Sequence, residues 1–318
     1  MIVPAGAGDL LRRLRAETTG VQFLAATDTA DAVRQAVEAE ALYGFNSIAV
    51  YEAAPRLRWV QAGSAGVEDY PLETFRERGI TLTNAKVIYG IQLADHAMAL
   101  ILAFSRQLPF LFRAQQRQDW VSRDQYPSGE LDGQVILILG LGGTGLELAR
   151  RAKAFGMRVL ATRRRTAPGA PRPGRPDFVD EIHPPEALHD LLPRADWVVV
   201  CLPLVPETRD VIGARELRLM KKSAYLINVT RGGIVETMAL VAALSAGRIA
   251  GAGLDVTEPE PLPPGNALWS MENVIITPHA AGHSPAAPER MAALLCENVR
   301  RFAAGRDLLN VVDLELGY

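Results

Sequence analysis

Val135-Ile-Leu-Ile-Leu-Gly-Leu-Gly-Gly-Thr-Gly-Leu-Glu-Leu-Ala149 is the stretch around which the chain is organised. Its first five residues are apolar and have the composition of a fully buried strand, and a helical pattern begins after Gly145. Three glycines lie between the two, in the strand–turn–helix arrangement of a dinucleotide site. The first permits a tight turn, the second lets backbone amides approach a pyrophosphate, and the third lets the helix pack closely on the strand. The residues predicted to bind a dinucleotide at this helix N-terminus are Gly140, Leu141, Gly142, Gly143, Thr144 and Gly145.

The length and composition describe an ordinary globular chain of two domains. The chain has 318 residues, 48% of them hydrophobic and 22% charged, and the usual domain size is ~100–200 residues. A net charge of −2 gives no electrostatic basis for binding nucleic acid or an anionic membrane. The sequence contains no apolar run of ~18 residues and no signal-peptide pattern, so we expect a cytoplasmic protein. Cys201 and Cys296 lack the spacing of metal ligands, so we expect two small buried thiols and no metal site.

The order of apolar runs predicts an α/β fold with two domains. Over residues 1–90, candidate strands at 21–26, 41–45, 57–62 and 80–83 alternate with helical patterns, one of which starts at Asp28 and reaches Glu38. Residues 92–108 form a long apolar pattern, which is typical of a helix that bridges domains. After the glycine turn, candidate strands follow at 158–162, 196–202, 224–229, 249–255 and 274–277.

This second series predicts a Rossmann-type doubly wound parallel sheet, beside a smaller flavodoxin-like α/β domain. The amphipathic pattern of residues 288–303 predicts a helix that returns to the first domain. We therefore assign residues 1–90 and 284–318 to a substrate domain, and residues 91–283 to a dinucleotide-binding domain.

Arginines follow the predicted strand at 158–162, about 20 residues after the glycine turn, where an acidic residue would hold the ribose 2′-hydroxyl of NAD. These are Arg163, Arg164 and Arg165. A carboxylate repels a 2′-phosphate, whereas a guanidinium pairs with it through charge-assisted hydrogen bonds. We predict that NADP(H) is preferred over NAD(H), which the site does not exclude. A solvated basic loop is the alternative interpretation.

Three ionisable residues, Arg231, Glu260 and His279, follow directly after predicted strands. The carboxyl ends of strands form the ligand crevice of an open α/β sheet, so the three can converge on one site. Histidine exchanges a proton near neutral pH, a carboxylate orients the ring, and arginine clamps a substrate carboxylate. Taken singly, the three also fit a helix cap, a solvated loop acid and a loop histidine. Their common placement favours catalysis.

Two further segments have both a functional and a structural interpretation. Ser64-Ala-Gly-Val67 follows a predicted strand, where its backbone N–H groups would cradle a small anion, although a tight loop also needs such residues. His96 next to Asp95 suggests catalysis, but its apolar neighbours favour a core or hinge histidine.

These motifs together resemble the D-isomer-specific 2-hydroxyacid dehydrogenase family. The resemblance rests on the glycine turn, Asn228-Val-Thr-Arg-Gly-Gly-Ile-Val235, Asp255-Val-Thr-Glu-Pro-Glu-Pro261 and Thr277-Pro-His279. It covers nearly the whole chain, since the Ser64 loop and Asp95-His96 fall where the family has its substrate loop and interdomain helix. It implies that Arg231 binds the 2-oxo acid and that His279, paired with Glu260, exchanges the proton. It also implies that Asp255 holds the nicotinamide carboxamide and that backbone groups around Ala65 and Gly66 take the substrate carboxylate.

The family pattern places its catalytic glutamate just before proline-leucine, which selects Glu260 over Glu258. Arg163 departs from the NAD-type acid and resembles the NADPH-using glyoxylate and hydroxypyruvate reductases. Thr230 stands where glycine is frequent, and Thr144 replaces a branched aliphatic residue.

We therefore predict an NADPH-preferring reductase that converts small 2-oxo acids, such as glyoxylate or hydroxypyruvate, to D-2-hydroxy acids. Its predicted catalytic residues are Arg231, Glu260 and His279, and its substrate site comprises Ser64, Ala65, Gly66, Arg231 and His279. Besides the glycine turn, the predicted cofactor site comprises Arg163, Arg164, Leu202, Pro203, Thr208, Val229, Thr230, Arg231, Asp255, His279 and Gly282. By the same resemblance, the polar arm at 109–130 implies a homodimer.

Two other functions remain open at this point. One is a phosphite or formate dehydrogenase on the same fold, although Glu260 argues against the formate branch, which has glutamine there by family resemblance. The other is a dinucleotide-sensing corepressor, which can keep the whole catalytic set.

Overall fold

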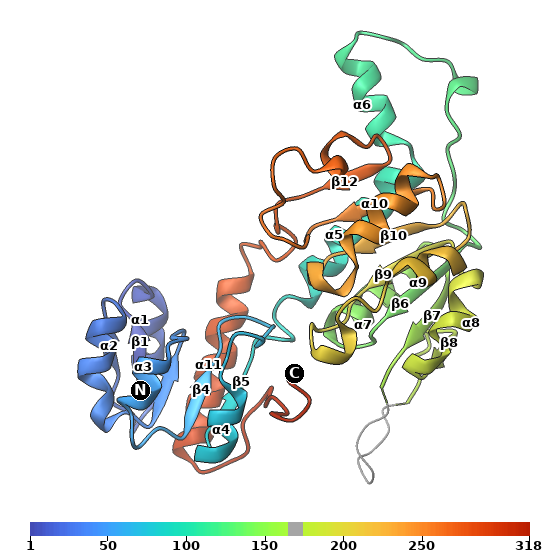
Figure 1. Cartoon of the computed structure of the whole chain (residues 1–318). Coiled ribbons are helices and arrows are strands. Elements are labelled where there is room, and N and C mark those ends of the chain that lie inside the picture. Colours follow the sequence, from blue (N-terminus) through green and yellow to red (C-terminus); the bar gives the residue numbers. More distant parts are fainter. Residues whose placement is uncertain (165–173) are drawn as a thin grey trace. The chain divides into compact units, whose positions relative to one another are not determined.

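The computed structural model describes residues 1–164 and 174–318, which form two compact units (Figure 1). One unit comprises Met1–Tyr89 and Ser284–Tyr318, and the other comprises Gly90–His283. Each unit contains one parallel β-sheet with helices on both faces. The predicted fold class, two α/β domains of which one is Rossmann-type, is confirmed.

The first unit has a five-stranded sheet in the order β2-β1-β3-β4-β5, the order of flavodoxin-like sheets. Its strands are β1 (Ile2–Pro4), β2 (Leu24–Ala26), β3 (Ala41–Tyr43), β4 (Trp59–Gln61) and β5 (Thr81–Thr83). Its helices are α1 (Gly8–Glu17), α2 (Thr29–Gln35), α3 (Ile48–Glu52), α4 (Leu72–Arg78) and α11 (Ala287–Ala303). Successive strand residues point to opposite faces: Leu42 and Val60 pack with α2, α3 and α4, whereas Ala41 and Trp59 pack with α1 and α11. The sheet is therefore buried on both sides, as parallel sheets are.

The second unit has a seven-stranded sheet in the order β12-β11-β10-β9-β6-β7-β8. Its strands are β6 (Val135–Leu139), β7 (Arg158–Thr162), β8 (Glu181–His183), β9 (Trp197–Val200), β10 (Tyr225–Asn228), β11 (Gly251–Leu254) and β12 (Val274–Ile276). Its helices are α5 (Gly90–Ser105), α6 (Leu108–Gln116), α7 (Gly143–Ala154), α8 (Leu188–Leu191), α9 (Ala214–Leu219) and α10 (Thr237–Ser245). The chain runs outward from β6 in one direction to β7 and β8, and later in the other direction from β9 to β12. The strand order therefore reverses between β6 and β9, and such a switch point is where open α/β sheets bind ligands.

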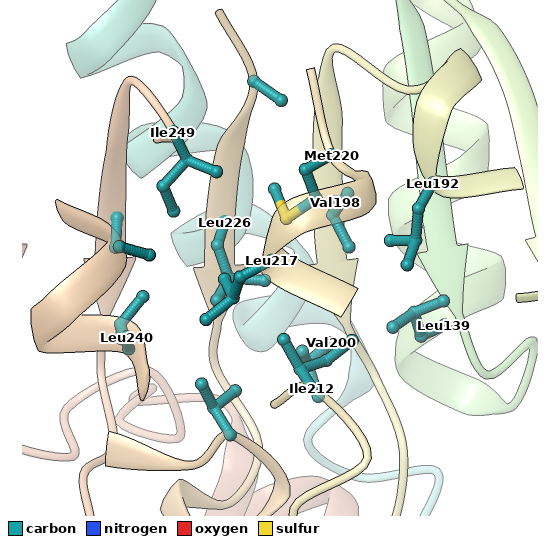
Figure 2. Close-up of a cluster of buried hydrophobic side chains, with 14 of the residues drawn as sticks. Leu139, Leu192, Val198, Val200, Ile212, Leu217, Met220, Leu226, Leu240 and Ile249 are labelled. Atoms are coloured by element: carbon teal, nitrogen blue, oxygen red, sulfur yellow. The ribbon is translucent and has the colours of Figure 1, made fainter. Parts of the chain in front are cut away.

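The apolar run of β6 is continuous because each of its two faces meets a different set of helices. Leu137 and Leu139 join a cluster with α8, α9 and α10, whereas Ile136 and Ile138 pack with α5 and α7. Figure 2 shows the first cluster, in which strand residues such as Leu226 lie close to Leu217 of α9. This packing holds the carboxyl ends of the strands in fixed positions at one edge.

The predicted helix at 92–108 is α5, which begins at Gly90 and ends at Ser105, and the chain then bends by 67° into α6. Gln107 adopts a left-handed conformation (φ 56°) and Pro109 lies in the first turn of α6, where its missing N–H costs no hydrogen bond. Part of the predicted polar arm is therefore helical. In the described ranges, no single helix is long and apolar enough to span a membrane. The α5–α6 pair passes that test of length and composition only as a bent unit.

Candidate active site

The turn between β6 and α7 has the shape that a dinucleotide pyrophosphate requires. Gly140 has a φ of +97°, and a Cβ there would lie 2.7 Å from the carbonyl oxygen of Cys201. A Cβ on Gly145 would lie 2.1 Å from the carbonyl oxygen of Gly140, so neither position has room for a side chain. Beside Gly142, which precedes the first residue of α7, nothing lies within 4 Å of a Cβ position. This open space in front of the helix N-terminus fits a phosphate group.

The end of β7 presents arginines to the same edge of the sheet. The buried Thr162 accepts hydrogen bonds from the amides of Gly140 and Leu141 (3.2 and 3.0 Å), which ties the glycine turn to β7. Arg163 follows directly, half-buried, and its amide donates to the carbonyl of His183 (2.9 Å); Arg164 is exposed. Arg165 lies outside the described residues. The first two described residues after β7 are thus basic, which suits a phosphate better than a ribose hydroxyl.

The other predicted cofactor residues follow the ends of β9, β10 and β12. Leu202 and Pro203 come just after β9, and the Thr208 hydroxyl donates to the Pro203 carbonyl (2.7 Å), which closes that loop. Val229 is buried directly after β10. The carbonyl of Gly282 accepts a hydrogen bond from Gln92 of α5 (3.2 Å). All these segments leave the sheet at the same edge as the glycine turn.

Arg231 is held at the end of β10 by a buried asparagine. The Asn228 amide donates to the Arg231 carbonyl (2.8 Å), and its side-chain oxygen accepts from the amide of Thr230 (3.2 Å). A Cβ on the next residue, Gly232, would lie 2.0 Å from the carbonyl oxygen of Thr257, so the two loops touch. The role of Asn228 was not predicted; the only signal in the sequence is an asparagine at a strand end, three residues before the arginine.

His279 and Glu260 form a hydrogen-bonded pair. The distance from His279 Nδ1 to Glu260 Oε1 is 2.6 Å, and the two side chains are 46% and 40% exposed. Glu258 lies 3.8 Å from Arg209 instead. With Nδ1 on the carboxylate, Nε2 is the ring atom that can exchange a proton with a substrate.

Neighbouring strands bring this pair to the same edge as Arg231. Asn228 of β10 pairs with Leu254 of β11, and Leu254 pairs with Ile276 of β12. The loops that carry Arg231, Glu260 and His279 therefore leave three adjacent strands in register. The structure places on one sheet edge the acid–base pair and the cation that the sequence patterns singled out.

Asp255 is fully buried and contacts the loop that carries His279. Its Oδ1 accepts from the Thr277 hydroxyl (2.5 Å) and the Ala280 amide (2.8 Å), and its Oδ2 accepts from the Ala281 amide (2.9 Å). Its assignment to the nicotinamide carboxamide stays a prediction. Sequence reasoning missed Thr277, which is also 2.9 Å from Nε2 of His96 on α5.

The Ser64 loop of the first unit follows β4, and its carbonyls accept hydrogen bonds from other groups of that unit. The carbonyl of Ser64 accepts from the Ala85 amide (2.9 Å), that of Ala65 from the buried Asn84 side chain (2.8 Å), and that of Gly66 from the Ser64 hydroxyl (2.6 Å). Among the hydrogen bonds of the described residues, the amides of Ala65 and Gly66 donate none. These two N–H groups can hold a small anion such as a carboxylate.

No group of three or more metal-ligating side chains that could hold an ion occurs within residues 1–164 and 174–318. Both cysteines are free, and burial raises the pKa of the Cys201 thiol to about 12. This thiol therefore stays protonated at neutral pH and is a poor nucleophile.

Comparison with known proteins identifies relatives for nearly the whole chain. Residues 98–281 match the family model described as D-isomer specific 2-hydroxyacid dehydrogenase, NAD binding domain. A glyoxylate reductase of Korarchaeum cryptofilum is 37% identical over 280 residues, which cover 84% of this chain and 79% of the relative.

Two solved structures extend the similarity to the complete chain. A D-isomer specific 2-hydroxyacid dehydrogenase of Xanthobacter autotrophicus Py2, in complex with NADPH and MES, has a TM-score of 0.83 and 31% identity over 100% of this chain and 98% of its own. An NADPH-dependent glyoxylate/hydroxypyruvate reductase of Sinorhizobium meliloti, in complex with NADP and malonate, has a TM-score of 0.76 and 29% identity over 99% and 97%.

Proposed function

The chain belongs to the D-isomer-specific 2-hydroxyacid dehydrogenase family of NAD(P)-dependent oxidoreductases, and from this premise we propose that it is an NADPH-preferring reductase of small 2-oxo acids. We propose glyoxylate, hydroxypyruvate or a related acid as the substrate and a D-2-hydroxy acid as the product. The observation that carries this proposal is the 2.6 Å contact between His279 and Glu260 on the sheet edge that also carries Arg231. The names of the glyoxylate reductase and the glyoxylate/hydroxypyruvate reductase to which the chain is similar support the substrate class.

A nicotinamide dinucleotide held by the glycine turn and the loops after β7, β9, β10 and β12 would supply the hydride for C2 of the 2-oxo acid, and the side chains of His279 and Glu260 would supply the proton transfer. His279 gives a proton from Nε2 to the carbonyl oxygen, so that the carbonyl gains one hydride and one proton and becomes a secondary alcohol, or a primary one from glyoxylate. Glu260 orients the ring through Nδ1 and stabilises its charged form.

We propose Arg231 and the Ser64 loop, each within its own unit, as elements that bind a carboxylate. A guanidinium offers two parallel N–H donors to a carboxylate, and in the first unit the amides of Ala65 and Gly66 offer backbone N–H donors to a small anion. A carboxylate held by Arg231 would present one face of C2 to a hydride donor, which is the proposed basis for the D configuration.

The preference for NADPH rests on the residues that follow β7. A guanidinium at Arg163 or Arg164 pairs with the 2′-phosphate, and neither residue presents a carboxylate that would select a free 2′-hydroxyl. The NADPH in the similar Xanthobacter autotrophicus structure supports this assignment. We propose that the glycine turn binds the pyrophosphate and that residues after β9, β10 and β12 complete the cofactor site: Leu202, Pro203, Thr208, Val229, Thr230, Asp255 and Gly282.

We propose substrate recognition for the unit of Met1–Tyr89 and Ser284–Tyr318, and dinucleotide binding for the unit of Gly90–His283. A cytoplasmic homodimer remains part of the proposal. The fully exposed Trp120 and the 56% exposed Phe112 offer apolar surface to a second copy.

A steady-state assay tests the function and separates its rivals. The purified protein is given NADPH or NADH with a panel of 2-oxo acids, and NADP⁺ or NAD⁺ with phosphite or formate. The proposal predicts oxidation of NADPH with at least one 2-oxo acid and a D-configured product wherever the product is chiral. Turnover of phosphite or formate alone would identify the dehydrogenase rival. Tight NADPH binding without any turnover would favour the dinucleotide-sensing corepressor.

A further inference from the structure

A chain of side-chain hydrogen bonds joins helix α5 to the loop that carries His279. Nε2 of His96 lies 2.9 Å from the Thr277 hydroxyl, and that hydroxyl lies 2.5 Å from Oδ1 of Asp255. The same histidine nitrogen is 3.6 Å from the Asp255 carboxylate, whose side chain is fully buried, while the His96 side chain is 22% exposed. His96 thus reaches the core of the site from a helix that carries none of its catalytic residues.

The direction of each hydrogen bond among His96, Thr277 and Asp255 follows from the number of hydrogens that each group carries. The carboxylate of Asp255 accepts from two backbone amides and therefore acts as an acceptor toward Thr277 as well. The Thr277 hydroxyl has one hydrogen, which it donates to Asp255. It can then only accept from His96, so Nε2 of His96 carries a proton.

Asp255, the last residue in this series of hydrogen bonds, contacts the backbone of His279, which has an uncommon conformation. His279 has a φ of 53°, in the left-handed region that is unfavourable for a non-glycine residue. Asp255 supports this conformation at three successive amides. Its backbone carbonyl accepts from His279 (2.8 Å), and its carboxylate accepts from the next two residues. The same conformation places Nδ1 of His279 against Glu260.

We propose that His96 is a positioning residue for His279. By donating to Thr277, it directs the Thr277 hydroxyl onto Asp255, and Asp255 in turn holds residues 279–281 in the conformation in which the imidazole meets Glu260. This inference rests on the proposed function, because it assumes that His279 is the proton donor. It extends that function to a histidine on α5, outside the residues proposed to bind substrate and cofactor.

The kinetic test compares variants that remove or keep the hydrogen bonds. His96→Leu and Thr277→Val are expected to lower kcat about 10- to 100-fold, because small misplacements of a catalytic group have such effects. The dissociation constant for NADPH is expected to keep its wild-type value. Thr277→Ser and His96→Gln, which keep a hydroxyl and a donor, are expected to recover most of the lost kcat.

Matched controls separate positioning from a general loss of stability. His189→Leu removes a histidine whose Nε2 is 2.8 Å from Glu216 on the α8–α9 side of the same unit, and it is expected to keep the wild-type kcat. Thr237→Val is the control for Thr277→Val: it removes a threonine hydroxyl that donates to the Glu258 carbonyl, and it is likewise expected to keep the wild-type kcat. The proposal is overturned if His96→Leu and Thr277→Val keep the wild-type kcat. An equal loss in Thr277→Ser and Thr277→Val would also overturn it, because packing rather than the hydroxyl would then matter.

A second measurement needs no activity. The chain has five histidines, so nitrogen-15 spectra of its imidazoles can be assigned by removing one histidine at a time. At a pH where His96 is neutral, the wild-type protein is expected to show the proton on Nε2. A proton on Nδ1 instead would overturn the inference, whatever the kinetic result of the Thr277 variants. Absence of reductase activity in the wild type would refute the proposed function, and the tautomer of His96 would still decide whether the hydrogen-bond chain exists.

Discussion

Replacing Glu260 by glutamine removes one charge from the acid–base pair and keeps its shape. The side-chain oxygen of glutamine can still accept a hydrogen bond from Nδ1 of His279, so the ring orientation is expected to persist. Only the attraction between a carboxylate and the protonated ring is lost. The Glu260→Gln variant therefore measures the electrostatic contribution of the pair.

The size of the effect follows from the exposure of the pair. Exposed ion pairs contribute about 0–1 kcal/mol, whereas breaking a buried pair costs about 3–5 kcal/mol. His279 and Glu260 are 46% and 40% exposed and 2.6 Å apart, which places them between these cases. A loss of about 1–2 kcal/mol corresponds to a decrease of roughly 5- to 30-fold in kcat for 2-oxo acid reduction.

The assay is NADPH oxidation at saturating 2-oxo acid, together with the dissociation constant for NADPH. Glu258→Gln serves as the matched control, since that glutamate lies two residues away beside Arg209 and makes no contact with His279 among the described interactions. Wild-type kcat in Glu260→Gln would refute the reasoning. So would an equal decrease in Glu258→Gln, because the loop as a whole would then be responsible.

Three further predictions concern the cofactor site and the stability of the second unit. Arg163→Ser is expected to raise the KM for NADPH roughly 10- to 100-fold and leave that for NADH unchanged, because a charged hydrogen bond of about 1.5–3 kcal/mol is lost; equal changes for both cofactors would contradict the 2′-phosphate assignment. Gly145→Ala is expected to lower the melting temperature, because its Cβ would lie 2.1 Å from a backbone carbonyl oxygen. Gly142→Ala is expected to keep the melting temperature and to weaken NADPH binding. The opposite pattern would contradict the assigned roles of these glycines. Hydrogen bonds from Arg194, His183 and Arg158 lower the pKa of Glu181 from 4.5 to about 2. The ionised form of Glu181 therefore stabilises the folded state above pH 4.5, and this contribution is lost as the pH falls to about 2. The difference in melting temperature between wild type and Glu181→Gln is expected to close over that interval; a difference that stays constant with pH would refute the role of this charge.

The sequence predicted most of the second unit because local patterns and tertiary packing agree there. The apolar run of β6 is continuous because two sets of helices cover its two faces, and the glycines that follow it are needed for contacts with Cys201 and with each other. Arg231 and His279 could be found because each lies two residues after a predicted strand, whereas Glu260 was selected over Glu258 by the family resemblance. β8 was missed because it is an edge strand whose residues are all half-buried, so no apolar pattern marks it. β1 was missed because Pro4 and Gly6 follow its short apolar run closely and interrupt the pattern.

The hydrogen bonds that position the proposed catalytic residues could not be predicted, because they join residues far apart in the sequence. Thr277 and His96 are separated by most of the dinucleotide-binding unit, and nothing in either local pattern indicates the hydrogen bond between them. Asn228 holds the Arg231 turn and Asn84 holds the Ser64 loop, and both contacts are likewise visible only in three dimensions. The break between α5 and α6 depends on one left-handed residue, Gln107, which the apolar periodicity does not reveal.

If His279 supplies the proton for reduction of a 2-oxo acid by NADPH, removing its imidazole must slow turnover. The most direct test compares the wild-type protein with His279→Ala in NADPH oxidation with glyoxylate and hydroxypyruvate, with NADPH affinity measured alongside. We expect turnover in the wild type and a decrease of about 10²- to 10⁴-fold in the variant, with NADPH affinity preserved, since this is the usual contribution of a general acid. Near-normal turnover in His279→Ala would contradict the account.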